Sequence, residues 1–142
     1  MIVVDASLVT KLVISEHDSE AARDWIRAVA QIAAPDLLIS EVTSAVVRRV
    51  NMRDLARTEG LNAIKGWLTQ CQRGVISFHR LTPLLVASAS EIAVQIGHPL
   101  SDCIYLALAC DLDCDLITCD AVLCDKAYPA VGRVRLLGER AA

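Results

Sequence analysis

The chain has 142 residues, of which 54% are hydrophobic and only 4% aromatic, and its formal net charge is −3. A chain of this length usually forms one domain, and the scarcity of aromatic residues indicates a core built from Val, Leu, Ile and Ala. The negative charge excludes binding of nucleic acid by a strongly basic surface, so any such binding has to depend on local charge or a bound metal ion.

We expect no membrane segment and no targeting signal. No apolar run reaches the roughly 18 residues that a membrane-spanning helix needs. The apolar start of the chain, MIVVDASL, contains Asp5 and lacks the basic residues of a signal peptide. The sequence therefore predicts a cytoplasmic protein that does not enter a membrane.

Cysteines are concentrated in the C-terminal third of the chain. They are Cys71, Cys103, Cys110, Cys114, Cys119 and Cys124. No CxxC pair occurs among them, which disfavours a zinc site, and the expected cytoplasmic location disfavours disulfides. We expect small, reduced and partly buried thiols, with zinc binding as the alternative.

The first part of the chain predicts one strand and two helices. Residues 1–4 form a short β-branched run, which predicts a buried strand that ends at Asp5. A helix follows, with its cap close to that aspartate. Apolar residues at helical spacing predict a second helix over 18–32, which Pro35 prevents from continuing.

Two more helices are expected before the next strand. One covers residues 39–51 with Ser40 as its cap, and the other covers residues 54–71 with an aspartate cap. Gly60 and Gly66 are expected to interrupt the second of these helices, because glycine weakens a helix interior.

The second half of the chain predicts strands that alternate with helices. An alternating apolar pattern, a proline at a helix start and a Gly-His-Pro break set the boundaries. In order, the expected elements are a strand over 75–81, a helix over 83–96, a helix from 101 or 102 to 109, a strand over 115–118, a short helix over 121–127 and a strand over 134–137.

This order of elements predicts an α/β protein, a three-layer α/β/α sandwich with a mainly parallel twisted sheet. We expect residues 1–138 to form one domain, because no linker or repeat interrupts them. Residues 139–142 are expected to form a loose C-terminal tail.

Four acidic residues are candidates for a functional site. Asp5 and Asp120 each follow a predicted strand, while Glu41 and Asp102 lie in the first turns of predicted helices. In an open α/β sheet, ligands bind outside the carboxyl ends of the strands. Four acids that lie far apart in the sequence can therefore meet in one cleft.

Metal binding is the physical reason to gather carboxylates in this way. Mg²⁺ prefers oxygen ligands, and a divalent ion reverses the local charge so that a phosphate can approach. Such an ion also polarises the phosphate and lowers the pKa of a water nucleophile. Each acid has a structural alternative: Asp102 can cap a helix, Asp120 can serve in a turn, and Glu41 can favour a helix dipole.

Four segments of the chain resemble the PIN-domain family, and within it the VapC-like toxins of bacterial toxin–antitoxin pairs. They are VVDASLV at 3–9, ISEVTSAVVRR at 39–49, HPLSDCIYLALA at 98–109 and LITCDAVL at 116–123. Their order and spacing follow the family along nearly the whole chain, and HPLSDCIYLALA is the most specific of them.

The resemblance implies a metal-dependent endoribonuclease that uses Mg²⁺ or Mn²⁺ and acts as the toxin of a toxin–antitoxin pair. It assigns Asp5, Asp102 and Asp120 to the metal. It also implies that Glu41 completes this catalytic cluster or holds a metal-bound water. A homodimer and a cognate antitoxin protein, which would reach a basic side chain into the acidic cleft, are further implications.

Contacts with RNA are expected from basic residues and hydroxyls near these acids. Arg48, Arg49 and Arg53 form a basic set, with the latter two on one face if the helix continues. A solvated polar helix face is the alternative role of these residues. Ser7 and Thr118 lie where the family often places a hydroxyl beside the acids, with capping and strand-end hydrogen bonds as the alternative. The few aromatic residues disfavour base stacking, so recognition of the RNA backbone or shape is expected.

Other functions stay open at this point. A catalytically silent PIN-fold module for protein–protein interaction is the main alternative, and the presence of all four acids argues against it. A DNA nuclease would use the same site chemistry. A phosphoacceptor domain of the receiver type is disfavoured, because the first strand carries a single acid and Lys126 lies in a predicted helix.

Overall fold

The computed structural model is built around a five-stranded sheet in which every neighbouring pair of strands is parallel. It describes residues 1–14, 19–28 and 31–138, so the expected tail at 139–142 lies outside the described residues. The strand order is β3-β2-β1-β4-β5, which puts β1 at the centre. The strands are β1 (Ile2–Val4), β2 (Ile32–Pro35), β3 (Ser77–His79), β4 (Asp115–Thr118) and β5 (Val134–Leu136).

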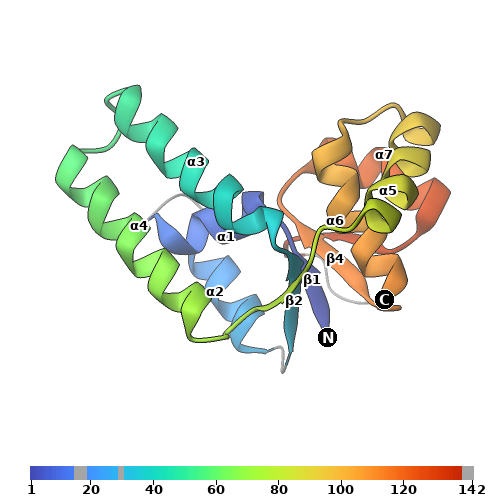
Figure 1. The fold of residues 1–142 in the computed structure, drawn as a ribbon, viewed down its shortest axis with the longest axis horizontal. Helices are drawn as coiled ribbons and strands as arrows, with labels where there is room; N and C mark the ends of the chain where they lie inside the picture. Colours follow the sequence, from blue (N-terminus) through green and yellow to red (C-terminus); the bar gives the residue numbers. More distant parts are fainter. Residues whose placement is uncertain (15–18, 29–30, 139–142) are drawn as a thin grey trace.

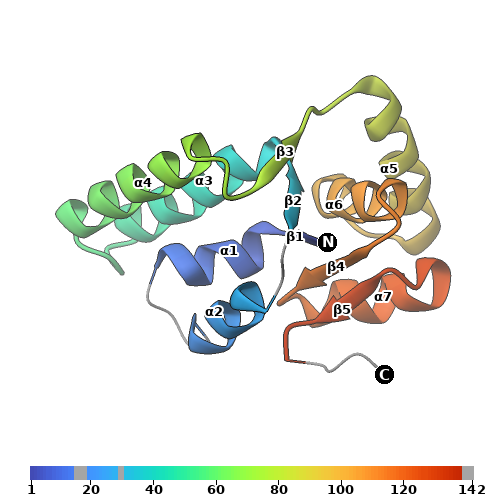
Figure 2. The ribbon, with the colours of Figure 1, turned by 90° about the horizontal axis from the view of Figure 1, so that it is seen from below.

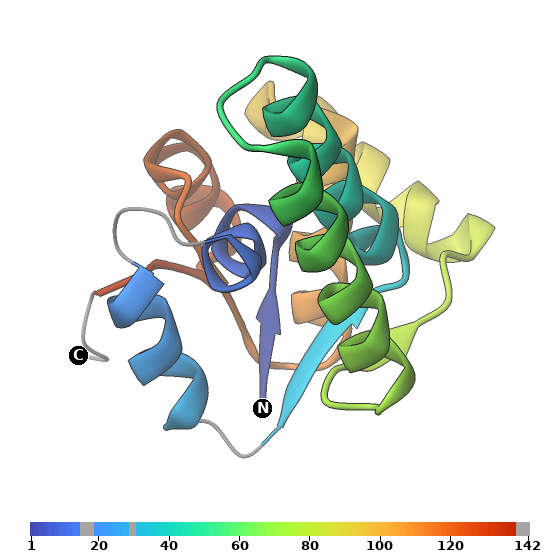
Figure 3. The same cartoon turned by 90° about the vertical axis from the view of Figure 1, so that its left-hand side faces the viewer.

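Helices lie on both sides of this sheet, as Figure 1 and Figure 2 show. One layer holds α1 (Ala6–Val13), α2 (Ser19–Arg27), α3 (Leu37–Asn51) and α4 (Arg57–Gln72). The opposite layer holds α5 (Pro83–Ile96), α6 (Leu100–Asp111) and α7 (Ala121–Val131). Figure 3 looks onto the first layer, where α3 and α4 pack side by side. The expected three-layer α/β/α sandwich is therefore confirmed.

The core consists of aliphatic residues from the central strands and from α6. Val3 and Val4 of β1 are fully buried, as are Leu116 and Ile117 of β4. In α6, every residue from 103 to 109 is buried, because this helix packs against the sheet on one side and against α5 on the other. A helix that is apolar on all sides has to be covered in this way.

No single helix in the described part of the chain is long and apolar enough to cross a membrane. Helices α5 and α6 reach that length and composition only when they are taken together, and the chain bends by 115° between them.

Strand β2 corrects the sequence prediction, which extended a helix to Ile32 and treated Pro35 only as a break. Helix α2 ends earlier, at Arg27. The segment IAAP is a strand because β1 pairs with it on one side and β3 on the other, and all four of its residues are buried. Two alanines and a proline carry little local strand preference, so long-range pairing decides the conformation here.

The expected starts of α3 and α4 are also wrong. Helix α3 begins at Leu37, so Ser40 lies within its first turn, where its hydroxyl donates to the Leu37 carbonyl over 3.4 Å. Helix α4 begins at Arg57, three residues after Asp54, the expected cap. Neither helix has a side-chain hydrogen bond from its N-cap, and the sequence signal was therefore weak at both starts.

Helices α6 and α7 are longer than expected. Helix α6 begins at Leu100, so Asp102 is the third residue of its first turn and not its cap. Helix α7 continues to Val131 and accommodates Pro129 in its last turns. The expected strand over 115–118 and the expected helix over 83–96 agree with β4 and α5.

Helix α4 runs without interruption through both of its glycines, and the two positions differ in the space around them. A Cβ added at Gly60 would lie 2.2 Å from Cγ2 of Val50 in α3, whereas a Cβ at Gly66 would meet nothing within 4 Å. Gly60 therefore allows α3 and α4 to approach closely.

We expect Gly60→Ala and Gly66→Ala to change stability in opposite directions. The Gly60 variant should lose about 1–3 kcal/mol because the added methyl overpacks the contact with Val50. Gly66→Ala should gain up to about 1 kcal/mol from helix propensity. Urea unfolding followed by circular dichroism measures both, and a stabilised Gly60 variant would contradict the close approach of the two helices.

Candidate functional site

Asp5 is held at the carboxyl end of the central strand β1. Its Oδ1 accepts hydrogen bonds from the Leu8 backbone N–H at 3.1 Å, which caps α1, and from Ser7 Oγ at 2.7 Å. Its Oδ2 accepts a hydrogen bond from the hydroxyl of Thr118 at the end of β4. The residue is only 6% exposed. Its carboxylate is therefore fixed in one orientation.

The hydroxyls of Ser7 and Thr118 join the ends of β1 and β4. Ser7 Oγ accepts the Cys119 backbone N–H at 3.0 Å, and Thr118 Oγ1 accepts the Asp120 backbone N–H at 3.0 Å. The two hydroxyl oxygens lie 3.2 Å apart. Both side chains thus make the expected strand-end hydrogen bonds and also contact the carboxylate of Asp5.

Burial makes the negative charge of Asp5 unfavourable in the absence of a nearby cation. It raises the pKa of Asp5 from 3.8 to about 6. Hydrogen bonds from Ser7, Thr118 and the Leu8 N–H oppose this rise, and the negative charge of Asp102 adds to it. A positive charge bound at this position would favour the ionised form.

Asp102 and Asp120 face each other across a histidine that the sequence analysis did not single out. His98 Nε2 lies 2.8 Å from Asp102 Oδ2 and 4.0 Å from Asp120 Oδ2. Asp120 is the N-cap of α7, and its Oδ1 accepts the Leu123 N–H at 3.0 Å. His98 stands four residues before Asp102 in the segment HPLSD, and this spacing was the available sequence signal.

Glu41 reaches the same region from α3 and is held by Tyr105 of α6. The buried phenol of Tyr105 donates a hydrogen bond to Glu41 Oε1. Burial raises the pKa of Glu41, the hydrogen bond from Tyr105 opposes the rise, and the charge of Asp102 adds to it. The pKa of Tyr105 is raised well above its usual range by burial and by these neighbouring acids, so the phenol remains a donor.

The donor set fits a divalent cation. One oxygen of Asp102, one oxygen of Asp120 and one nitrogen of His98 all lie within 4.8 Å of one another. Carboxylate oxygens suit Mg²⁺ and Mn²⁺, and an imidazole nitrogen beside them can either bind a divalent ion or hydrogen-bond to one of the carboxylates. Asp5 is not part of this close group, but its charge interacts with that of Asp102.

A groove of about 720 Å³ lies beside these acids, between α1 and α3. Its lining combines Glu41, the hydroxyls of Ser7, Thr10 and Ser44, and the basic residues Lys11 and Arg48. A second hollow of about 360 Å³ shares Ser44 and Arg48 and extends along α3 toward Met52. Among the residues that the structure describes, no aromatic side chain lines either hollow.

The structure separates the three arginines expected to contact RNA. Arg48 lines the groove because it lies two helical turns after Glu41 on the same face of α3. Arg49 does not line it. Arg53 lies beyond the last residue of α3 with φ of 62°, so the helix does not continue far enough for Arg49 and Arg53 to share a helix face.

The cysteines form no metal site in the described chain. None of the six forms a disulfide in that part of the chain, and none belongs to a group of three or more potential ligands there. Cys103, which follows Asp102, is fully buried, and burial raises the pKa of its thiol. A raised pKa keeps a thiol protonated and unreactive, as expected for a core residue.

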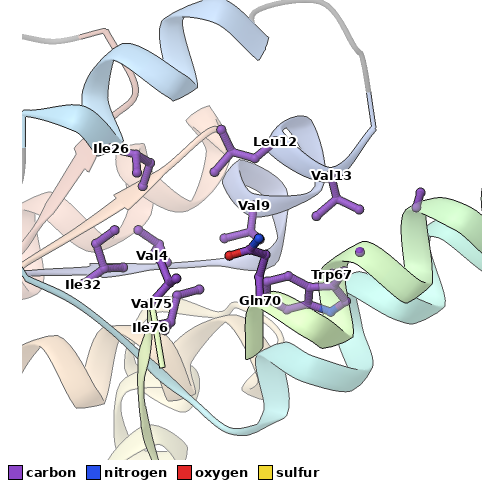
Figure 4. A pocket seen from close by; sticks show the side chains of 12 residues that line it. Val4, Val9, Leu12, Val13, Ile26, Ile32, Trp67, Gln70, Val75 and Ile76 are labelled. Atoms are coloured by element: carbon purple, nitrogen blue, oxygen red, sulfur yellow. The ribbon is translucent and has the colours of Figure 1, made fainter. Parts of the chain in front are cut away.

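A separate apolar pocket of about 370 Å³ lies on the other side of α1 (Figure 4). Val9 and Leu12 of α1, Ile26 of α2 and Trp67 of α4 contribute to its lining. None of the four candidate acids lines it. This pocket therefore cannot supply the phosphate chemistry that the carboxylates suggest.

The raised pKa of Asp5 predicts a pH-dependent stability in metal-free protein. The folded state binds this proton more tightly than the unfolded state, so stability should fall by up to about 3 kcal/mol as the pH rises from 4 to 6. Asp5→Asn should then be more stable than the wild type above pH 6 and lose this advantage below pH 4.

Urea unfolding in EDTA between pH 4 and 8 measures the effect. Asp111→Asn, at the exposed end of α6, is the matched control for removal of one negative charge. An advantage of Asp5→Asn that stays constant over this pH range would contradict the raised pKa.

Comparison with known proteins identifies the family of the chain. The model of the PIN domain matches residues 2–128. No curated protein sequence matches the chain significantly. A toxin–antitoxin complex from Klebsiella pneumoniae has a TM-score of 0.71 at 15% identity, and the match covers 99% of this chain and 100% of the other.

Two further solved structures share the fold. VapC20 of Mycobacterium tuberculosis, described as a sarcin–ricin loop cleaving toxin, has a TM-score of 0.73 at 15% identity and is matched over 92% of this chain and 96% of its own. PAE2754 of Pyrobaculum aerophilum has a TM-score of 0.68 at 20% identity, and the match covers 94% of this chain and 81% of the other. With the PIN model matching most of its length, the chain belongs to the PIN domain family.

Proposed function

We propose that the protein is a metal-dependent endoribonuclease, the toxin of a toxin–antitoxin pair, which hydrolyses RNA phosphodiester bonds. The proposal depends on one observation: carboxylate oxygens of Asp102 and Asp120 lie close enough together to bind the same metal ion. They lie at the carboxyl edge of the sheet of a PIN-family protein, where the charge of the buried Asp5 interacts with that of Asp102. The M. tuberculosis structure of the same fold is described as a sarcin–ricin loop cleaving toxin, which supports RNA as the substrate.

In this proposal Asp5, Asp102 and Asp120 hold Mg²⁺ or Mn²⁺. When bound, such an ion neutralises the phosphate and lowers the pKa of a water nucleophile. Tyr105 donates to Oε1 of Glu41, so Oε2 would be the oxygen of this carboxylate that accepts a proton from an attacking water. The hydroxyls of Ser7 and Thr118 keep the Asp5 carboxylate oriented.

The groove suits the sugar–phosphate backbone of RNA. Lys11 and Arg48 supply positive charge for phosphates, and the hydroxyls of Thr10 and Ser44 can hydrogen-bond to phosphate or ribose. Without aromatic residues in its lining the groove offers no stacking platform for bases. Arg48 is the arginine that we place on the substrate.

We further propose the partner that the family resemblance implies, a cognate antitoxin. The K. pneumoniae structure is a toxin–antitoxin complex, which supports such a partner. Homodimer formation and a cytoplasmic location complete the proposal, and size-exclusion chromatography with light scattering measures the first of these.

We expect purified, antitoxin-free protein to cut cellular RNA at discrete sites with Mg²⁺ or Mn²⁺ and not with EDTA. Asp102→Asn should lower the rate at least about 100-fold, because loss of a metal ligand removes several kcal/mol of transition-state stabilisation. Asp111→Asn, on the same helix, should cleave like the wild type. Absence of cleavage by the folded wild type with either metal would instead favour the catalytically silent interaction module.

We also expect Arg48→Ala to raise KM for RNA and leave kcat nearly unchanged, since the side chain contacts the backbone away from the reacting phosphate. The slope of log affinity against log salt concentration should fall by about 1 for one lost phosphate contact. Arg57→Ala, at the exposed start of α4 and outside the groove, is the matched control. Equal effects of the two variants would exclude a specific contact by Arg48.

A further inference from the structure

The backbone of His98 is fixed by a turn between α5 and α6. Gly97 ends α5 in the left-handed region, with φ of 65°, and the His98 N–H donates to the Ala93 carbonyl at 3.1 Å. Lys126 of α7 donates to the Gly97 carbonyl at 2.9 Å. Pro99 follows and begins the approach to α6. The position of the imidazole is therefore set by three helices.

The two ring nitrogens of His98 have different surroundings: Nε2 faces the candidate acids, and Nδ1 is buried in the protein interior. Its side chain is 7% exposed, and Nε2 lies 2.8 Å from Asp102 Oδ2. Nδ1 is buried and has no hydrogen-bond partner among the described residues. A proton on Nδ1 would leave a buried donor unsatisfied and would turn the Nε2 lone pair toward a carboxylate oxygen. Nε2 therefore carries the hydrogen and donates a hydrogen bond to Oδ2 of Asp102.

This N–H lies between two carboxylates that repel each other. It bonds to Oδ2 of Asp102, and Oδ2 of Asp120 is 4.0 Å from the same nitrogen. The donor fixes the rotation of the Asp102 carboxylate and leaves Oδ1 for other contacts. Its positive end also reduces the cost of holding both acids close together in metal-free protein.

We propose that His98 is a positioning residue of the metal site: its Nε2–H holds Asp102 beside Asp120 and thereby raises the affinity for the divalent ion. The inference rests on the metal site of the proposed function. His98 does not itself coordinate the ion, because coordination would move the proton to Nδ1, which has no acceptor there. Histidines that do bind metals usually donate their other N–H to a carboxylate, a carbonyl or water.

Binding of Mn²⁺ to the full-length protein without RNA tests this proposal, with the free ion followed by electron paramagnetic resonance. His98→Leu keeps an apolar side chain of similar size but removes the donor, and it should weaken binding by about 10- to 100-fold. In His98→Gln the amide N–H can reach the place of Nε2, so affinity should stay within about threefold of the wild type. His79→Leu, at the end of β3, is the matched control.

Thermal unfolding separates this effect from a loss of structure. If His98→Leu does not fold, His98→Asn takes its place, because the shorter amide cannot reach Asp102 and should weaken binding in the same way. In addition, protein labelled with ¹⁵N-histidine and loaded with Mn²⁺ should show no hyperfine coupling from a directly bonded nitrogen.

Two results would overturn the inference alone: Mn²⁺ binding by folded His98→Leu that equals the wild type, or a directly bonded ¹⁵N signal together with loss of binding in His98→Gln. A wild type that binds no Mn²⁺ would overturn both the inference and the metal dependence of the proposed nuclease. Affinity that depends on His98 in a protein that cuts no RNA would support the inference and contradict only the proposed function.

Discussion

The parallel pairing of β1 with β4 is the constraint on which the candidate site depends. Val3 pairs with Leu116 and Val4 with Ile117, so both strands end at the same edge of the sheet. Asp5 and Thr118 stand at these ends and are joined by a hydrogen bond. The register matters for the site, because a shift of β1 by one residue would move Asp5 away from the Thr118 hydroxyl that bonds to it. The sheet thus positions the acids before any ligand is present.

Two of the candidate acids are held by a specific donor from another part of the fold. Tyr105 of α6 binds Glu41 of α3, and Thr118 of β4 binds Asp5 after β1. These donors leave other carboxylate oxygens available while they restrict side-chain rotation. Removing one of them would leave a buried acid with fewer partners, which is costly in a low-dielectric interior. The surrounding hydrogen bonds therefore belong to the site as much as the acids do.

The sequence predicted those parts of the fold that local patterns determine. Strand β4 and helix α5 were correct because an apolar run and a proline at a helix start define them. Strand β2 was missed because its identity comes from pairing on both sides. The acids could be named from the resemblance, but His98 and Tyr105 could not be assigned a role, since their partners are defined only by packing between layers. Similarly, the place where α3 ends separates Arg53 from Arg48.

The distance along the chain between the two halves of the site has a consequence for synthesis. The hydroxyls of Ser7 and Thr118 are 111 residues apart in sequence, yet they lie within 3.2 Å. A growing chain on the ribosome contains Asp5 and Glu41 long before Asp120 and strand β4, which lies beside β1, are made. Parallel strands of this kind pair late because a long loop has to close first. A nascent PIN chain therefore has no assembled acidic centre until synthesis has passed Asp120, and the part made before that point cannot act through the complete set of acids.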